Sequence, residues 1–183
     1  MQGDPRIIDL LNQVLRKELT GINQYFIYSR MCKNWGYGVL EKVHHDEAID
    51  EMKHADLVIQ RILFLDGVPD LADYDRILVG PTPREQFESD LALEHAALAV
   101  LRPGIALCLE IADHGTRDLL ERIVVDEETT STGSRLSATR SRRSAISSTW
   151  RSRSTLDAAG RGVGLVREDP GAAAFLDTPR RHL

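Results

Sequence analysis

The stretch Glu51-Met-Lys-His54 decides the fold of this chain, because three other glutamates on separate helical segments are placed to meet it. Glu18, Glu94 and Glu127 each interrupt an apolar stripe that has helical spacing. A carboxylate inside a helical bundle is costly unless a cation neutralises it. A Glu-x-x-His pair, joined by a glutamate from each of two further helices, is the ligand pattern of a di-iron carboxylate site. These residues therefore predict a helical bundle built around metal.

This predicted ligand set lacks one member. A second Glu-x-x-His should begin at Glu127, but the residue three positions later is Thr130. A single inward glutamate is more often a helix-edge residue whose stem reaches water. Four glutamates at inward phases, with His54 on the same face as Glu51, are hard to explain as solvated surface. Carboxylate oxygens combined with imidazole suit iron or manganese, so we interpret the set as a metal site.

Helical periodicity divides the first 128 residues into four segments, at about residues 5–35, 39–65, 83–112 and from 115 onward. Thr82, Pro83 and Glu85 form a good start signal for the third segment. Pro103-Gly104 is expected to loosen or kink that segment. A connection of about 17 residues separates the second and third segments, whereas the other links are short. The pattern predicts an all-α four-helix bundle with a long crossover between the second and third helices.

Composition changes sharply after Glu128. Residues 1–128 carry 13 Lys and Arg against 24 Asp and Glu, whereas residues 129–183 carry ten Arg, no Lys and four acids. The second part is rich in Ser, Arg and Gly and has no apolar stripe, so we expect the fourth helix to be truncated and the tail to be largely disordered. The expected domains are therefore a di-iron domain over 1–128 and a tail over 129–183.

The remaining composition predicts a soluble cytoplasmic protein. Cys32 and Cys108 lie in helical patterns and give no disulfide framework, so we interpret them as buried thiols in a reducing compartment. The N-terminal residues show no basic start followed by an apolar run, as a signal peptide would. We expect that no apolar run is long enough to span a membrane.

Five stretches resemble bacterioferritins, the haem-containing branch of the ferritin-like family. Together they place the resemblance on residues 1–128, about 70% of the chain, and the second and last of them carry the chemistry. The stretches are Glu18-Leu-Thr-Gly-Ile-Asn-Gln-Tyr-Phe26, Asp50-Glu-Met-Lys-His-Ala-Asp56, Arg61-Ile-Leu-Phe-Leu65, Asp90-Leu-Ala-Leu-Glu94 and Asp126-Glu-Glu128.

The resemblance implies a ferroxidase, an enzyme that oxidises Fe(II) to Fe(III) with oxygen or peroxide. Its two iron ions per subunit would be bridged by Glu51 and Glu127, and Tyr25 would hydrogen-bond near the site. The resemblance also implies dimers that assemble into a shell of 24 subunits storing ferric mineral. The full set of implied iron ligands is Glu18, Glu51, His54, Glu94 and Glu127.

Met52 is rotated about 100° from Glu51 on the helix, so it faces away from the predicted metal site together with Ile49 and Ile59. Methionine at such a position is most often core filler. A second apolar face nevertheless indicates a second helical partner and hence a dimer. The resemblance implies haem b shared between two subunits, with Met52 of each as an axial ligand. It also implies that three residues line the haem pocket, namely Leu19, Asn23 and Phe26.

His44 and His45 precede the motif by about two turns. Bacterioferritins often carry an iron-handling histidine at position 46, which is Asp46 here. Asp46 or Asp50 could take that role, although a solvated helix face is the more common explanation for such residues.

A shifted reading frame explains the residues after Glu128. Thr-Thr-Ser-Thr-Gly-Ser-Arg, at positions 129–135, can be encoded as ACC ACA TCG ACT GGC TCG AGA. Restoring one C in front gives CAC CAC ATC GAC TGG CTC GAG, which reads His-His-Ile-Asp-Trp-Leu-Glu. That frame returns a histidine to position 130 and a helical pattern to the segment. We hypothesise that one base is lost after the codon of Glu128, so that the tail is out of frame and has no expected function.

Two alternatives stay open. The chain could be a haem-bridged dimer without ferroxidase turnover. The arginines of the tail could instead form a nucleic-acid arm that contacts phosphates. Nucleic-acid binding is the less expected of the two, because Trp150 is the only interleaved aromatic and the shifted frame accounts for the arginines.

Overall fold

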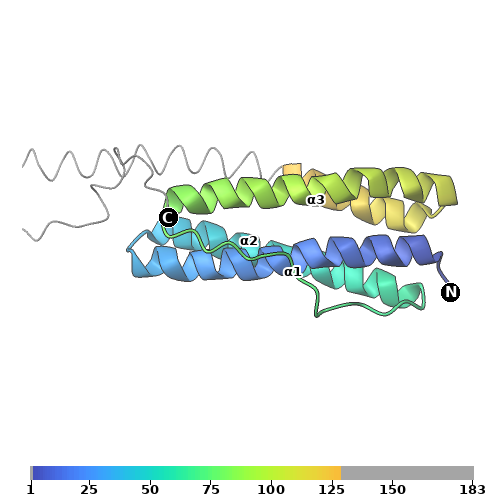
Figure 1. Cartoon of the computed structure of the whole chain (residues 1–183), viewed down its shortest axis with the longest axis horizontal. Coiled ribbons are helices and arrows are strands. Elements are labelled where there is room, and N and C mark those ends of the chain that lie inside the picture. The colour runs from blue at the N-terminus through green and yellow to red at the C-terminus, as the bar shows by residue number, and fades with distance from the viewer. Residues whose placement is uncertain (1, 129–183) are drawn as a thin grey trace, which may run out of the picture. The chain divides into compact units, whose positions relative to one another are not determined.

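The protein forms an all-α bundle over residues 2–128, the part that the computed structural model describes. No strand occurs among these residues. The helices are α1 (Pro5–Asn34), α2 (Gly38–Phe64), α3 (Pro83–Ile111) and a fourth helix, described over residues 114–128 (Figure 1). The predicted four-helix bundle is thus confirmed. The expected truncation of the fourth helix and the expected disorder of the tail lie outside the described residues.

Local sequence signals set the helix ends. The carboxylate of Asp4 accepts a hydrogen bond from the Arg6 amide at 2.9 Å, and Pro5 follows in the first turn, where its missing N–H is no loss. At the start of α3, the Thr82 hydroxyl accepts from the Glu85 amide at 3.3 Å and donates to the Glu85 carboxylate at 2.8 Å. This reciprocal pair is the capping box that the sequence predicts.

The core lies along the seam where α1 packs against α2 and α3. Its side chains recur at three- and four-residue spacing, as one face of each helix requires. Each fully buried large aliphatic side chain contributes about 1.5–3 kcal/mol relative to an exposed one. Members from all four helices are Leu11, Val14, Leu15, Val58, Ile62, Leu101, Leu120 and Ile123.

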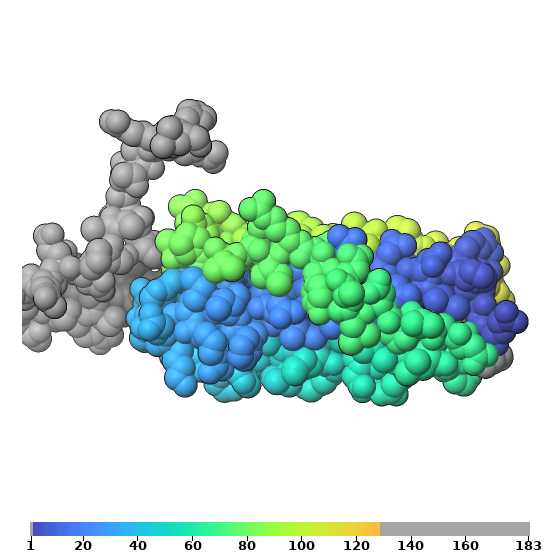
Figure 2. Space-filling view, turned by 60° about the horizontal axis from the view of Figure 1, so that its bottom comes forward, coloured from blue at the N-terminus to red at the C-terminus, as the bar shows by residue number. Residues whose placement is uncertain are grey.

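Hydrogen bonds from α1 hold the long crossover, residues 65–82, along the bundle (Figure 2). The Asn12 amide oxygen accepts from the backbone of Asp70 at 2.9 Å, and the Thr20 hydroxyl accepts from Asp75 at 3.0 Å. Because the crossover runs back along the bundle, α3 begins at the end where α2 also begins (Figure 1). This arrangement brings the middle of α3 level with the middles of α1 and α2.

We expected no segment long and apolar enough to span a membrane, but α3 meets that criterion by its length and composition alone. An 18-residue window of this helix has a mean hydropathy of 1.4. In the bundle, however, α3 packs against α1, contributes Leu101 to the core and buries Asp90 and Glu94. Burial of two carboxylates on one face is typical of a helix that surrounds a polar centre, so we assign the apolar length of α3 to bundle packing.

Candidate metal centre

Each of the four helices places an acidic side chain in the bundle interior. Glu18 of α1, Glu94 of α3 and Glu127 of the fourth helix are only 1%, 4% and 6% exposed. Each continues the buried stripe of its own helix, as Glu18 continues that of Val14, because residues four apart share a face. On α2, one turn separates Glu51 from His54, and their side chains are mostly buried. The predicted inward phases of all five residues are confirmed.

Three of the glutamates converge on His54. Its Nδ1 atom lies 3.4 Å from Glu18 Oε2, 3.6 Å from Glu51 Oε2 and 3.8 Å from Glu127 Oε1. One possible ligand atom from each of the four residues lies within 4.8 Å of the other three. A cation at the centre of such a group would contact all four side chains at once.

Several of the converging atoms lack a hydrogen-bond partner among the described residues. Both carboxylate oxygens of Glu18 and the Nδ1 atom of His54 are buried without a partner in hydrogen-bonding geometry among the described residues. Buried polar atoms are nearly always satisfied, and an exception calls for an explanation such as an ion. Oxygen and imidazole donors in this number suit iron or manganese, so the residues fit a metal ion.

The electrostatics of the site favour an added positive charge. Burial and the carboxylate of Glu18 raise the pKa of Glu51 well above its usual range. Burial, together with Glu51, raises the pKa of Glu127 to about 8. Burial alone would lower the pKa of His54, but the carboxylates of Glu18 and Glu51 outweigh it and raise the pKa to about 11. The raised pKa values mean that Glu51 and Glu127 take up protons rather than stand ionised side by side, and a metal cation could take the place of those protons.

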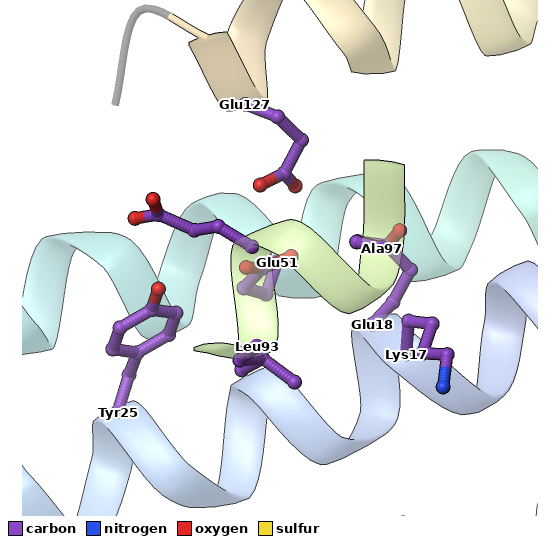
Figure 3. Close-up of a pocket in the computed structure, with 8 residues that line it drawn as sticks. Lys17, Glu18, Tyr25, Glu51, Leu93, Ala97 and Glu127 are labelled. Atoms are coloured by element: carbon purple, nitrogen blue, oxygen red, sulfur yellow. The ribbon is translucent and has the colours of Figure 1, made fainter. Parts of the chain in front are cut away.

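A small cavity lies among these side chains (Figure 3). Glu127 points into it from the fourth helix, and the Tyr25 hydroxyl points toward the carboxylates from α1. Burial raises the pKa of Tyr25 well above its usual range, so this phenol keeps its proton. Gly21 leaves room on the same helix, since a Cβ atom there would come within 3.0 Å of Glu51 Oε1. Tyr25 thus lines the same cavity as the carboxylates of Glu18 and Glu51.

Glu94 lines the same cavity as Glu18, Glu51 and Glu127. It is not among the four residues whose ligand atoms lie within 4.8 Å of one another. Its carboxylate is buried, and its negative charge helps to raise the pKa of Tyr25 and Glu127. Glu94 therefore faces the centre from α3 without joining the tight group.

The sequence matches known proteins over this same region. Residues 8–132 match the ferritin family, described as a ferritin-like domain. The chain is 49% identical over 128 residues to the bacterioferritin of Mycobacterium leprae, covering 70% of this chain and 80% of that protein. It is 43% identical over 128 residues to the bacterioferritin of Rhodobacter capsulatus, with the same coverage. The chain belongs to the bacterioferritins, within the ferritin-like family.

A solved bacterioferritin from Rhodobacter capsulatus has the same fold. The match has a TM-score of 0.71 at 42% identity and covers 72% of this chain and 82% of that one. That structure is described as having a metal-free dinuclear site and a haem iron in a crystallographic special position. The predicted ferritin-like bundle and the predicted bacterioferritin resemblance are both confirmed.

The residues that the resemblance assigns to haem lie at or near the surface of a single chain. Met52 on α2 is 44% exposed, and Phe26 on α1 is also exposed. Leu19 is half-buried, whereas Asn23 is exposed and donates from its amide to the Leu19 carbonyl at 2.7 Å. An exposed apolar set on two packed helices is compatible with a second subunit, as the bacterioferritin resemblance implies.

His44 and Asp90 form a buried polar pair that the sequence did not reveal. His44 is not on a solvated face, because it packs among the rings of Tyr25, Tyr28 and Phe87. Its Nδ1 atom lies 3.8 Å from Asp90 Oδ2. Burial lowers the pKa of His44 to about 4 and raises the pKa of Asp90 well above its usual range. Only the partners brought by α1 and α3 could have shown this burial.

Two further neighbours of the centre were also missed. Asp126, next to Glu127, places Oδ2 3.4 Å from His54 Nε2, and Lys17, next to Glu18, lines the cavity. The sequence alone does not show that Asp126 and Lys17 lie at the centre. Each is a charged residue beside a predicted ligand on a helix, so it would be assigned to the neighbouring, solvated face.

The surface candidates of α2 stay at the surface. Asp46 and Asp50 are exposed and pair with Lys42 and Lys53 at 2.6 Å, whereas His45 is half-buried. The arrangement matches the solvated helix face that was the more common explanation.

Proposed function

We propose that this chain is an iron-storage protein of bacterioferritin type that oxidises Fe(II) to Fe(III) at the centre formed by Glu18, Glu51, His54 and Glu127. The observation that carries the proposal is the convergence of acidic side chains from separate helices on one imidazole, with ligand atoms within 4.8 Å of one another. Membership of the bacterioferritins supports it. The proposed activity is that of a ferroxidase, with oxygen or peroxide as the oxidant.

We assign each side chain a role in holding Fe(II), the substrate. Glu18, Glu94 and His54 would each hold one iron ion, and Glu51 and Glu127 would be shared between two ions. Two ions held a few ångströms apart let one oxidant take electrons from both. The bundle keeps the carboxylates out of water, which strengthens their attraction for the cations. Tyr25 keeps its proton and donates a hydrogen bond toward the carboxylates.

The proposed centre is asymmetric, because the described residues bring one histidine, His54, to it. The residue three positions after Glu127 is Thr130, whereas the position three after Glu51 is His54. We therefore expect one ion to bind firmly and the second weakly, so that turnover is slower than for a centre with two imidazoles. A chain with full ferroxidase turnover would contradict this part of the proposal.

Aerobic oxidation of Fe(II) tests the activity. The chain should raise the initial rate of ferric absorbance above that of buffer, and Glu127→Gln should lower that added rate at least tenfold, because one carboxylate is lost. Glu121→Gln is the matched control, since Glu121 is an exposed acid on the same helix. Equal rates for the parent chain and Glu127→Gln would contradict the proposal.

Haem binding by a dimer is a second candidate function, which the exposed Met52 favours. We propose that two subunits would hold haem b between them, with the Met52 thioether of each as an iron ligand and with Leu19, Asn23 and Phe26 lining the pocket. A haem-loaded chain should show the optical spectrum of bis-thioether ligation, and Met52→Leu should abolish it. The same spectrum without any oxygen-dependent iron oxidation would favour the haem-bridged dimer as the whole function.

We also propose the organisation that goes with storage. Residues 1–128 form the di-iron domain, and residues 129–183 are an out-of-frame tail without a function of their own. The match to the ferritin-like domain ends at residue 132, near that boundary. Dimers would assemble toward a 24-subunit shell in the cytoplasm, where the buried thiols of Cys32 and Cys108 stay reduced.

A further inference from the structure

Lys17 brings a cationic side chain to the edge of the candidate metal centre. It adjoins Glu18 on α1 and lines the same cavity as Glu51, Glu94 and Glu127. Its side chain is 17% exposed, so it is shielded from bulk water. No other Lys or Arg lines this cavity in the described part of the chain. Figure 3 shows its ammonium nitrogen directed away from the labelled carboxylates.

Asp75, on the crossover, holds that ammonium group. Lys17 Nζ donates to Asp75 Oδ2, while Arg16 Nε lies 2.7 Å from Asp75 Oδ1. The backbone amide of Asp75 donates to the hydroxyl of Thr20, a residue of α1, at 3.0 Å. This hydrogen bond holds Asp75 against α1. Asp75 would therefore keep a cationic partner and its backbone hydrogen bond even without Lys17.

We propose that Lys17 is a built-in cation that opposes metal binding at the neighbouring carboxylates, and that Asp75 restrains it; the inference rests on the proposed metal centre. The ammonium group is a compact point charge on a flexible four-carbon stem. Turned from Asp75 toward Glu18 and Glu51, it would occupy the carboxylates that a metal ion needs. Even when it stays on Asp75, its charge repels a divalent cation across a partly dry cavity.

A purely structural role for the pair predicts a different outcome. If Lys17 and Asp75 serve only to fasten the crossover, loss of either residue loosens the same contact. Both substitutions would then change metal affinity in the same direction, or not at all. The proposed role predicts opposite signs, because removing the lysine removes the competing cation whereas removing the aspartate releases it.

Anaerobic titration of the full chain with Co²⁺, followed by cobalt absorbance, measures the two signs. Lys17→Met should tighten the dissociation constant roughly threefold to tenfold, since one repelling charge near the site is lost. Asp75→Asn should weaken it, and the effect should vanish in the double variant, which is expected to bind like Lys17→Met alone. Lys17→Arg should bind less tightly than Lys17→Met, because it retains the charge.

Lys42→Met is the matched control, because Lys42 is an exposed lysine paired with Asp46 on α2. It should leave the dissociation constant unchanged. If Lys17→Met does not fold, Asp75→Asn alone still tests the proposal, because it should weaken Co²⁺ binding. Equal affinities, or a shift of the same sign in both single variants, would overturn the inference alone. A parent chain that binds no Co²⁺ would overturn the proposed function as well.

Discussion

The burial of His44 makes the stability of this bundle sensitive to acid. Its folded pKa of about 4 lies below the ordinary value of 6.5 because burial disfavours the charged imidazole. Between these two values the unfolded chain binds a proton that the folded chain does not. The free energy of unfolding therefore falls as the pH drops from about 6.5 to 4. Above pH 6.5 His44 is neutral in both states and causes no such loss.

Replacing His44 tests this sign. In His44→Gln, the loss of unfolding free energy between pH 7 and pH 4.5 should be smaller by about 2 kcal/mol than in the parent chain. Urea unfolding at both pH values measures the difference, and the other titrating groups cancel because both chains share them. His95→Gln should behave like the parent, since His95 is exposed. Identical acid losses in all three chains would contradict the assigned burial.

Individual ligands could be predicted from sequence, whereas their neighbours could not. The phase of Glu18 follows from Val14 and that of Glu127 from Ile123, because helical spacing alone fixes which residues share a face. The environment of His44 depends instead on rings and a carboxylate from two other helices. The contact of Lys17 with Asp75 depends on where the crossover lies. Both contacts depend on the tertiary structure, and the spacing of residues along one helix cannot predict them.

At the scale of single elements, the N-terminus of α3 depends on Thr82. Its hydroxyl satisfies the Glu85 amide and is held in turn by the Glu85 carboxylate. Thr82→Ala should lower the free energy of unfolding by about 1 kcal/mol, because the first turn loses its cap. Thr82→Ser keeps a capping hydroxyl and should retain most of the stability in the same denaturant titration. A Thr82→Ala variant as stable as the parent would show that the cap contributes nothing.

Helix bounds were predictable to within about a residue or two, as strong caps and breakers allow. Asp4, Pro5 and Thr82 act through local hydrogen bonds, so the sequence contains their effect. Pro103 is different, because α3 continues through it to Ile111. The next residue, Gly104, lies in tight contact with Leu10 of α1, since a Cβ atom there would come within 2.7 Å of that side chain. Packing against α1 therefore accounts for a helix that continues through a stretch where local signals predicted loosening or a kink.

For the whole molecule, the hypothesis of a lost base predicts a repairable protein. One base inserted after the codon of Glu128 would restore a histidine at position 130 and apolar residues after it. Three to five large side chains buried at ~1.5–3 kcal/mol each would contribute roughly 5–15 kcal/mol, as much as the stability of a whole domain. The repaired chain should therefore melt at a much higher temperature and assemble into larger particles.

Calorimetry and size-exclusion chromatography, run on both chains, check this expectation. A chain truncated after Glu128 is the control, because it lacks both the out-of-frame and the restored segments. Equal melting temperatures and equal particle sizes for the repaired and original chains would contradict the lost-base hypothesis.

The most direct test of the metal centre is a crystal structure of this chain soaked in Mn²⁺, with an anomalous difference map. A strong peak should lie within coordination distance of Glu18, Glu51, His54 and Glu127, and His54→Ala should weaken it. A map without a peak there, in which the four side chains turn out toward solvent, would contradict the account.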